Sequence, residues 1–224
     1  MSAPYDAIGG GVDPNYGAAV PPESRPTARP EIRLVTDADV DAVSISLARA
    51  FHDDPVKLHL TGGKTLTEQR VAPFFRAFQR MQMPHGHVYT TADLGAGAIW
   101  APPGHWKVPF TSVLKNAPTF LKMYGWRFLP NLQVLSDMER KHPTEPHYYL
   151  EIIGTDPAHQ GKGYGTALMQ PMVERADAEG VGMYLESSKE SNVPFYARFG
   201  FEVRETLDHR RNGPRMWLMW RDPR

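Results

Sequence analysis

The sequence contains no cysteine, which excludes disulfide scaffolds, cysteine-ligated zinc sites and a cysteine nucleophile. It has no surplus of charge, since 25 Lys and Arg residues balance 25 Asp and Glu residues. Proteins that grip nucleic acid usually carry a basic surplus, so nucleic-acid binding is disfavoured. No segment approaches the ~20 continuous apolar residues of a membrane span, and no basic stretch followed by an apolar core marks a signal peptide. We expect a cytoplasmic protein with no membrane or nucleic-acid partner.

The 224 residues suffice for one domain of ordinary to large size. Residues 1–30 are rich in Pro and Gly and bury too little apolar surface to offset the entropy of ordering them, so a disordered tail is predicted there. An α/β domain is expected over 31–224. Hydrophobic periodicity predicts helices over 40–51 (capped by Thr36 or Asp37), 68–81, 109–140 (broken near Pro130), 163–179 and 192–199. Strands are predicted over 31–34, 88–91, 98–101, 147–154, 182–187, 201–208 and 215–220, the last two joined by a turn at Asn212-Gly213.

The most informative run, over 154–168, lies between a predicted strand and a predicted helix. Gly161, Gly163 and Gly165 leave no side chains where the backbone turns into the helix. Successive N–H groups at a helix N-terminus suit a pyrophosphate, and Lys162 could add positive charge at the rim. The spacing excludes a Rossmann fingerprint and a P-loop. A plain tight turn remains the alternative to an anion site.

Two motifs resemble the GNAT superfamily of acetyltransferases. Gln160, Gly163 and Gly165 match its Gln-x-x-Gly-x-Gly/Ala cradle, and the run from Asn192 to Phe201 is similar to the signature that closes the superfamily's core. Two motifs in this order, ~30 residues apart, are more specific than either alone. Over 137–220 the chain is similar to the puromycin N-acetyltransferase-like members.

The resemblance implies a GNAT fold: a mixed, mostly antiparallel sheet of about six or seven strands, with parallel strands four and five splayed apart and helices on both faces. It implies an acetyl-CoA-dependent N-acetyltransferase that passes the acetyl group directly to an amine in a ternary complex. The pantetheine would lie between strands 147–154 and 182–187 and pair with the backbone of the first. The implied donor-binding residues are Ile152, Ile153, Gly154, Thr155, Gln160, Gly161, Lys162, Gly163, Tyr164, Gly165, Thr166 and Asn192.

The same resemblance points to the catalytic groups. Tyr196 occupies the family's general-acid position, and a phenol can donate a proton to a thiolate; a core tyrosine is the alternative. Some members carry a carboxylate base at the place of Glu151, which alternation puts on the same face as Tyr149 and Ile153. The puromycin-like members commonly have a small residue there, so this chain departs from them. Glu186 is the second candidate base, and a strand-end carboxylate paired with Arg or Lys is the alternative for both.

The acceptor pocket is expected around the loop after the first helix, the aromatic stripe of the second helix and strand 98–101. Aspartates in that loop could attract a cationic amine, whereas a solvated loop and an ordinary aromatic core are the alternatives. His85 and His87 lack an identifiable third ligand, so no metal site is expected. The expected acceptor residues are Phe51, Asp53, Asp54, Phe74, Phe75 and Trp100.

Three functions remain open at this point. The first is acetylation of a small-molecule amine, such as an antibiotic or an aminoacyl metabolite, by a monomer or homodimer. The second is acetylation of a protein lysine or N-terminus, which needs an open groove, whereas the bulky helical segment 109–140 favours a covered pocket. The third is a non-catalytic acyl-CoA-binding sensor, which the presence of both Tyr196 and Glu151 disfavours.

Overall fold

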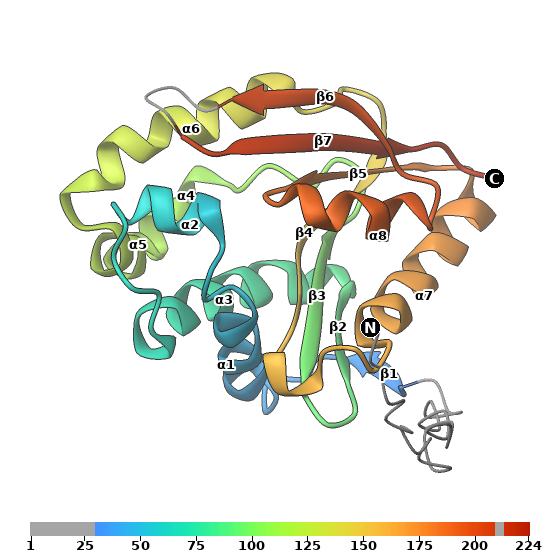
Figure 1. The fold of residues 1–224 in the computed structure, drawn as a ribbon, viewed down its shortest axis with the longest axis horizontal. Coiled ribbons are helices and arrows are strands. Elements are labelled where there is room, and N and C mark those ends of the chain that lie inside the picture. Colours follow the sequence, from blue (N-terminus) through green and yellow to red (C-terminus); the bar gives the residue numbers. More distant parts are fainter. Residues whose placement is uncertain (1–29, 209–212) are drawn as a thin grey trace, which may run out of the picture.

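A computed structural model describes residues 30–208 and 213–224. The predicted tail and the predicted turn at Asn212-Gly213 fall outside these residues, except for Pro30 and Gly213. The described strands form one seven-stranded sheet in the order β1-β2-β3-β4-β5-β7-β6, which confirms the predicted sheet (Figure 1). All neighbouring strands are antiparallel except β4 and β5, which are parallel. The strands are β1 (Ile32–Leu34), β2 (Val88–Thr91), β3 (Ala96–Ala101), β4 (His147–Thr155), β5 (Gly182–Ser187), β6 (Glu202–Asp208) and β7 (Arg215–Arg221).

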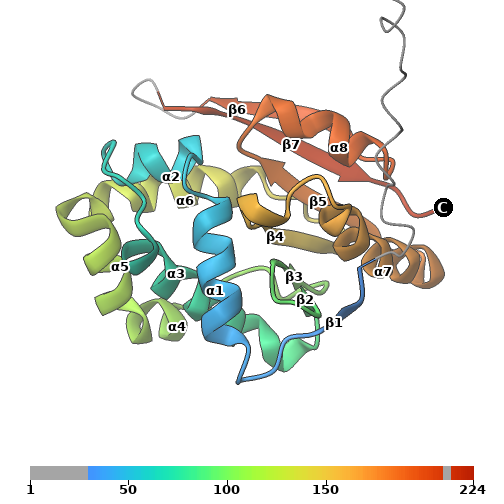
Figure 2. The same ribbon diagram turned by 60° about the horizontal axis from the view of Figure 1, so that its bottom comes forward.

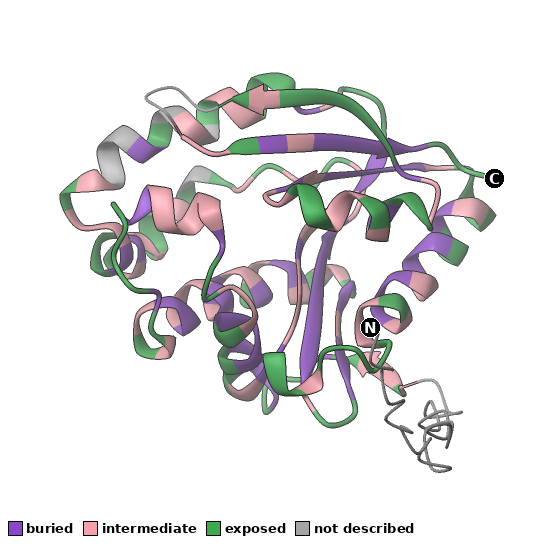
Figure 3. Ribbon diagram, in the orientation of Figure 1, coloured by how far each residue is buried: buried purple, intermediate pink, exposed green. Residues whose placement is uncertain are grey.

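Helices cover both faces of the sheet, and each face has its own apolar core (Figures 1 and 2). The helices are α1 (Val40–Ala50), α2 (Pro55–Leu60), α3 (Glu68–Gln82), α4 (Phe110–Lys115), α5 (Ala117–Tyr124), α6 (Phe128–Lys141), α7 (Tyr164–Glu179) and α8 (Val193–Ala197). Strand β3 is buried along its whole length, because Ile99 packs into the core with α1 and α3 while Trp100 packs into the core with α7 (Figure 3). Full burial of such side chains stabilises the fold by about 1.5–3 kcal/mol each. None of the described helices is long and apolar enough to cross a membrane.

Two helical regions differ from the prediction. Helix α2 was not predicted: Asp54 caps its N-terminus by accepting a hydrogen bond from the Lys57 N–H at 2.7 Å, and Pro55 occupies the first helical position. The segment 109–140 is interrupted at Asn116 and Gly125, not at Pro130. Pro130 is the third residue of α6, where a helical N–H has no carbonyl partner in its own helix, so proline interrupts nothing there.

The N-terminus of α1 corrects a second expectation. Neither Thr36 nor Asp37 caps this helix, because the N-cap position is Asp39. The Asp39 carboxylate turns back instead, accepting hydrogen bonds from the Thr36 backbone N–H and hydroxyl, and pairing with Arg33 at 2.6 Å. These contacts hold the pKa of Asp39 well below its usual range. The carboxylate therefore fastens β1 to the start of α1.

The parallel strands part halfway along their length. They pair from His147–Gly182 to Leu150–Leu185, and β4 has no β5 partner beyond that point. On its other side β4 carries a β-bulge, since Ile99 pairs with Ile152 and the next residue, Trp100, pairs with Leu150. Glu151 is the extra residue, and it is also the first β4 residue past the parting of the strands.

The bulge corrects the predicted alternation along β4. Glu151 bonds to Gln82 of α3, and Ile152 packs into the core that contains α1 and α3. Ile153, by contrast, packs against the core that contains α7, as Leu150 does. Glu151 and Ile153 therefore lie on opposite faces of the sheet, because one inserted residue shifts the two-residue period by one.

Candidate active site

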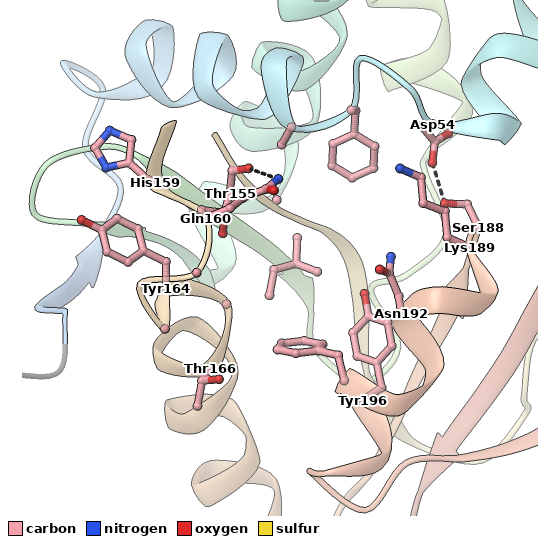
Figure 4. Close-up of a pocket in the computed structure, with 18 of the residues that line it drawn as sticks. Asp54, Thr155, His159, Gln160, Tyr164, Thr166, Ser188, Lys189, Asn192 and Tyr196 are labelled. Atoms are coloured by element: carbon pink, nitrogen blue, oxygen red, sulfur yellow. Dashed lines mark hydrogen bonds between the residues drawn. The ribbon is translucent and has the colours of Figure 1, made fainter. Parts of the chain in front are cut away.

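A cavity of about 540 Å³ follows the half of β4 that β5 does not pair with, between this strand and the helices α7 and α8 (Figure 4). Two predicted donor-binding residues do not line it. Ile152 is buried in the core beneath α1 and α3, and the Lys162 ammonium donates a hydrogen bond to the Ala158 carbonyl at 3.1 Å. The predicted residues that do line it are Ile153, Gly154, Thr155, Gln160, Gly161, Gly163, Tyr164, Gly165, Thr166 and Asn192.

The glycine run forms the turn into α7. Gly161 and Gly163 have φ of 76° and 81°, a left-handed conformation that side chains disfavour, and no other atom would meet an added Cβ within 4 Å. Gly163 is the N-cap of α7, so the first N–H groups of the helix lie at the cavity wall without partners in their own helix. The Gln160 side-chain amide donates to the Thr155 carbonyl at 3.3 Å, which joins the turn back to β4. This geometry suits a phosphate group.

The third glycine has a different role. Gly165 lies inside α7 at the point where the Phe195 ring of α8 approaches it, and an added Cβ would lie 3.2 Å from that ring. Gly154 on β4 is similarly crowded, because an added Cβ would lie 2.9 Å from the Ala50 side chain of α1. Glycines at these two positions let α7 approach α8 and let β4 approach α1 around the cavity.

Cationic and aromatic side chains that the sequence did not single out also line the cavity. His159 lies 3.2 Å from Asp93, which also accepts a hydrogen bond from the Tyr164 hydroxyl at 2.5 Å. The Arg198 guanidinium lies over the Phe195 ring, 5.2 Å from its centroid. His159 directly precedes the first recognised motif and Arg198 stands within the second, so closeness to the motifs was the signal that could have found them.

Tyr196 lies on α8 in the cavity wall, and only 7% of its surface is exposed (Figure 4). Its ring packs against Phe195 and Phe201, with centroids 5.1 and 6.2 Å away. Burial raises the pKa of its phenol well above the usual value, because the charged form would lose its solvation. The side chain is therefore protonated at neutral pH.

The two candidate bases differ in their surroundings. Glu151 accepts a hydrogen bond from the Gln82 amide at 2.7 Å, and burial raises the pKa of its carboxyl to about 8, with the charge of Glu186 acting in the same direction. Glu186 accepts a hydrogen bond from the Tyr149 hydroxyl at 2.6 Å and lies 3.7 Å from His142 Nδ1. Its side chain is 4% exposed. Neither carboxyl contacts an Arg or Lys among the described residues, and neither lines the cavity; Glu186 is held among the rings of Tyr149 and His142.

The loop after α1 closes one end of the cavity. Phe51 and Asp54 line it, together with Ser188 and Lys189 from the loop after β5. Asp54 accepts a hydrogen bond from the Ser188 hydroxyl at 2.5 Å, and Asp53 pairs with the Lys189 ammonium at 2.6 Å. Asp53 is thus paired with a cation, and the buried Asp54 carboxylate is held by two hydrogen bonds, so neither is the freely solvated loop charge that the sequence suggested.

The predicted aromatic residues of the acceptor pocket separate into two groups. Phe74 and Phe75 of α3 contact each other, and Phe51 packs on Phe75 with a centroid distance of 5.2 Å. The Lys57 ammonium lies over the Phe51 ring at 4.3 Å. Trp100 does not belong to this group, because it is fully buried in the core on the α7 side of the sheet.

The two histidines of the 85–87 segment point to different neighbours. The His85 ring packs on His105, with centroids 4.4 Å apart, and the His87 ring packs edge-on against Tyr148 at 5.5 Å. No group of three or more potential metal ligands occurs among residues 30–208 and 213–224.

Comparison with known proteins agrees with this geometry. The model of the acetyltransferase (GNAT) family matches residues 126–201, which hold β4, the glycine turn and α8. An uncharacterized N-acetyltransferase of Schizosaccharomyces pombe is 28% identical over 204 residues, covering 85% of this chain and 83% of that protein. A structure described as histone acetyltransferase HPA2 and related acetyltransferase, from Corynebacterium glutamicum, has a TM-score of 0.61 at 22% identity, covering 87% of this chain and 97% of that one. Arylalkylamine N-acetyltransferase 2 from Aedes aegypti has a TM-score of 0.63 at 12% identity, covering 87% and 99%. These two structures share the fold with this chain.

The parted strand β4 and the glycine turn both fall within the matched residues, so the site agrees with an N-acetyltransferase. Over residues 126–201 the chain matches the GNAT family of N-acetyltransferases, whose donor is acetyl-CoA. The family, the fold and the donor agree with the sequence prediction.

Proposed function

We propose that this enzyme acetylates the primary amine of a small molecule by direct transfer in a ternary complex, with Tyr196 as general acid and Glu151 as general base. The observation that carries the proposal is the course of the cavity. It begins at the glycine turn, follows the unpaired half of β4 as far as Ile153, and is lined by Tyr196. Glu151 lies two residues before Ile153 on the same strand, outside the cavity wall. No other described carboxyl occupies the point where β4 and β5 part, apart from Glu186, which is held by Tyr149.

The residues present fit acetyl-CoA. The glycine turn and the first N–H groups of α7 would hold the pyrophosphate, and the unpaired backbone over 152–155 would pair with the pantetheine amides. Asn192 would contact the arm from α8, and Lys162 stands at the rim with Gly161 and Gly163. When bound, acetyl-CoA supplies an acetyl thioester.

The pKa values of Tyr196 and Glu151 suit an acid and a base respectively. The raised pKa of Tyr196 keeps a proton at its Oη, which an acid needs when a thiolate leaves. The pKa of Glu151, about 8, lies near the operating range of a base that must take a proton from an ammonium group. A backbone N–H near Ile153 is the proposed donor to the developing oxyanion.

The packing of helices over the paired half of β4 and β5 supports a small acceptor. Val56 of α2 and Met138 of α6 pack against Tyr149, Tyr184 and their neighbours on β7, so helices rather than an open groove lie over this region. Phe51 provides an apolar wall to the cavity, and Phe75 and Phe74 pack behind it. The similarity of 137–220 to the puromycin acetyltransferase-like members adds aminoacyl-type amines to the candidate acceptors.

Thiol release from acetyl-CoA tests the proposal, with tyramine, spermidine, puromycin, an amino acid and a lysine peptide as acceptors. Release with a small amine, reduced by about 100-fold or more in Tyr196→Phe with unchanged affinity for acetyl-CoA, is the expected result. Release only with the lysine peptide would favour protein acetylation. Unchanged turnover in Tyr196→Phe would remove this residue from the acid role.

A further inference from the structure

Gln82 and Glu151 form a buried polar pair at the parting of β4 and β5. Gln82, the last residue of α3, is 5% exposed, and its Nε2 donates to Glu151 Oε1 at 2.7 Å. The other two oxygens of the pair, Gln82 Oε1 and Glu151 Oε2, are also buried and have no hydrogen-bond partner among the described residues. Buried polar atoms without a partner cost free energy, so they call for an explanation.

The chemistry of the pair defines what would complete it. In its ionised form, which predominates above about pH 8, Glu151 offers only acceptors, so the Gln82 amide then presents its NH2 group to Glu151 and leaves its oxygen free. Two free oxygens remain, and both accept hydrogen bonds. An anion would be repelled here, whereas a primary amine or ammonium group brings N–H donors and a charge of the matching sign.

The pair lies beside the cavity on β4 without lining it. Glu151 is the bulged residue of β4 and the first one past the last β5 pair, Leu150–Leu185. Ile153, two residues further on, lines the cavity. Gln82 reaches Glu151 from the opposite side of the sheet to α7. The free oxygens therefore lie at the inner end of the unpaired β4 segment, on the side covered by α3.

We propose that Gln82 and Glu151 together receive the nitrogen of the acceptor amine, with Gln82 Oε1 and Glu151 Oε2 accepting its N–H groups. This rests on the proposed function and adds Gln82 as a substrate-binding residue. Glu151 Oε2 takes one proton from the ammonium, which frees the nitrogen's electron pair. The nitrogen then bonds to the acetyl carbon as the carbon–sulfur bond breaks, and the departing sulfur takes the proton of Tyr196. The second proton that the amine nitrogen loses returns the phenol to its neutral form through solvent, and Glu151 releases the proton it took to solvent before the next turnover.

Two neighbouring side chains, Gln82 and Glu186, shift the pKa of Glu151 besides its burial. The pKa of Glu151 therefore reports on the loss of the Gln82 hydrogen bond. Glu186 acts on it from β5 and raises its pKa, while the hydrogen bond from Gln82 of α3 lowers it. On its own strand, Tyr149 is the neighbouring titratable group. Removing the Gln82 amide should therefore raise the pKa of Glu151 and move the acid limb of activity to higher pH.

The same helix supplies a matched control. Gln79 is fully buried one turn earlier, and its Nε2 donates to the Val40 carbonyl at 3.2 Å and to Ser44 Oγ at 2.7 Å. Its Oε1 also lacks a described partner. Gln79→Met and Gln82→Met remove the same polar group from the same buried helix face, and only the second removes a contact with Glu151.

The experiment compares the two variants with the wild-type enzyme, using tyramine and spermidine as acceptors. In Gln82→Met, the KM for the amine should rise by about tenfold or more with the KM for acetyl-CoA unchanged, because only the nitrogen site loses a partner. Carbon-13 NMR of labelled glutamate carboxyls should show Glu151 titrating at higher pH in Gln82→Met than in Gln79→Met, without any acceptor present.

Equal amine KM and equal Glu151 titration in both variants would overturn the inference while leaving the proposed function intact. Wild-type protein that binds acetyl-CoA but acetylates none of the small amines tyramine, spermidine, puromycin and the amino acid would overturn the proposed function and this inference together. Both variants should show a lower midpoint of thermal unfolding than the wild-type enzyme, because each loses a buried polar side chain. The Gln79→Met variant measures this loss of stability, so that it can be separated from the effect on amine binding.

Discussion

Asp54 of the α1–α2 loop accepts a hydrogen bond from the Ser188 hydroxyl at 2.5 Å, although the two residues are far apart in the sequence. The other oxygen of the same carboxylate caps α2 through the Lys57 N–H. One buried side chain thus starts a helix and joins it to the loop after β5 at the end of the cavity. Its neighbour Asp53 makes the parallel contact, to Lys189, at the surface.

The two aspartates should differ in their contribution to stability. Asp54 is 3% exposed, so Asp54→Ala should cost about 2–3 kcal/mol, from the lost cap and from the unpaired Ser188 hydroxyl. The side chains of Asp53 and Lys189 are 54% and 32% exposed, so Asp53→Ala should cost under about 1 kcal/mol. Urea denaturation of both variants measures the difference, and equal losses would contradict the assignment of the cap.

Glu151 should impose a pH dependence on both rate and stability. Its pKa is raised from an ordinary value of 4.5 to about 8, so kcat/KM should fall as the pH drops below about 8. Between these two values the folded protein keeps a proton that the unfolded chain releases. The contribution of the protonated Glu151 to the free energy of unfolding is therefore fully present below about pH 4.5, and it is lost as the pH rises to about 8.

Glu151→Gln removes this ionisation. Its free energy of unfolding relative to wild type should grow with pH across that window, by at least about 1 kcal/mol, as measured by denaturation at several pH values. A kcat/KM profile that keeps its acid limb in Glu151→Gln would show that another group is the base.

Glu186→Gln separates the two candidate bases. The amide oxygen can still accept the Tyr149 hydrogen bond, but the negative charge is gone. The pKa of Glu151 should then fall, and the acid limb of kcat/KM should move to lower pH with the maximal rate largely kept. A loss of turnover of about 100-fold at every pH would instead assign the base role to Glu186.

The glycines of the cradle should respond differently to alanine. Gly163→Ala places a side chain at φ 81° and should cost about 1–2 kcal/mol of stability. Gly165→Ala lies inside α7, where alanine favours the helix by up to about 1 kcal/mol, yet its Cβ would meet the Phe195 ring at 3.2 Å. Gly165→Ala should therefore keep its stability and bind acetyl-CoA several-fold more weakly.

Gly180→Ala is the control for backbone strain, because Gly180 has φ 66° at the far end of α7 and does not line the cavity. It should lower stability as Gly163→Ala does and leave acetyl-CoA affinity unchanged, as measured by calorimetric titration. Weakened acetyl-CoA binding in Gly180→Ala would mean that stability alone governs the affinity.

Local patterns predicted much of the molecule. Helix α3 follows from its periodic apolar residues, and the glycine turn follows from a composition that only a few backbone geometries use. Helix α2 left a signal that was not used, since an Asp-Pro pair can start a helix as well as follow one. The breaks in the segment 109–140 are also local: Asn116 lies between α4 and α5, and Gly125 ends α5 with a φ of 60°. Pro130 lies in the first turn of α6, where a helix tolerates proline.

Other features depend on contacts between distant parts of the chain and leave no local pattern. The bulge at Glu151 is set by the register between β3 and β4, and it reverses the face expected for Ile153. Trp100 suits a pocket wall as well as a core, and only the packing of α7 decides between them. The bond between Asp54 and Ser188 likewise depends on how two loops meet in the folded molecule.

The early parting of β4 and β5 has a consequence for how the molecule opens. Only four residue pairs join β1–β4 to β5–β7 across the middle of the sheet. Proteins open locally in cooperative units, and a short seam of this kind is a natural boundary between two of them. A donor lying in the gap would span that seam, so binding should slow amide hydrogen exchange on both sides of it at once.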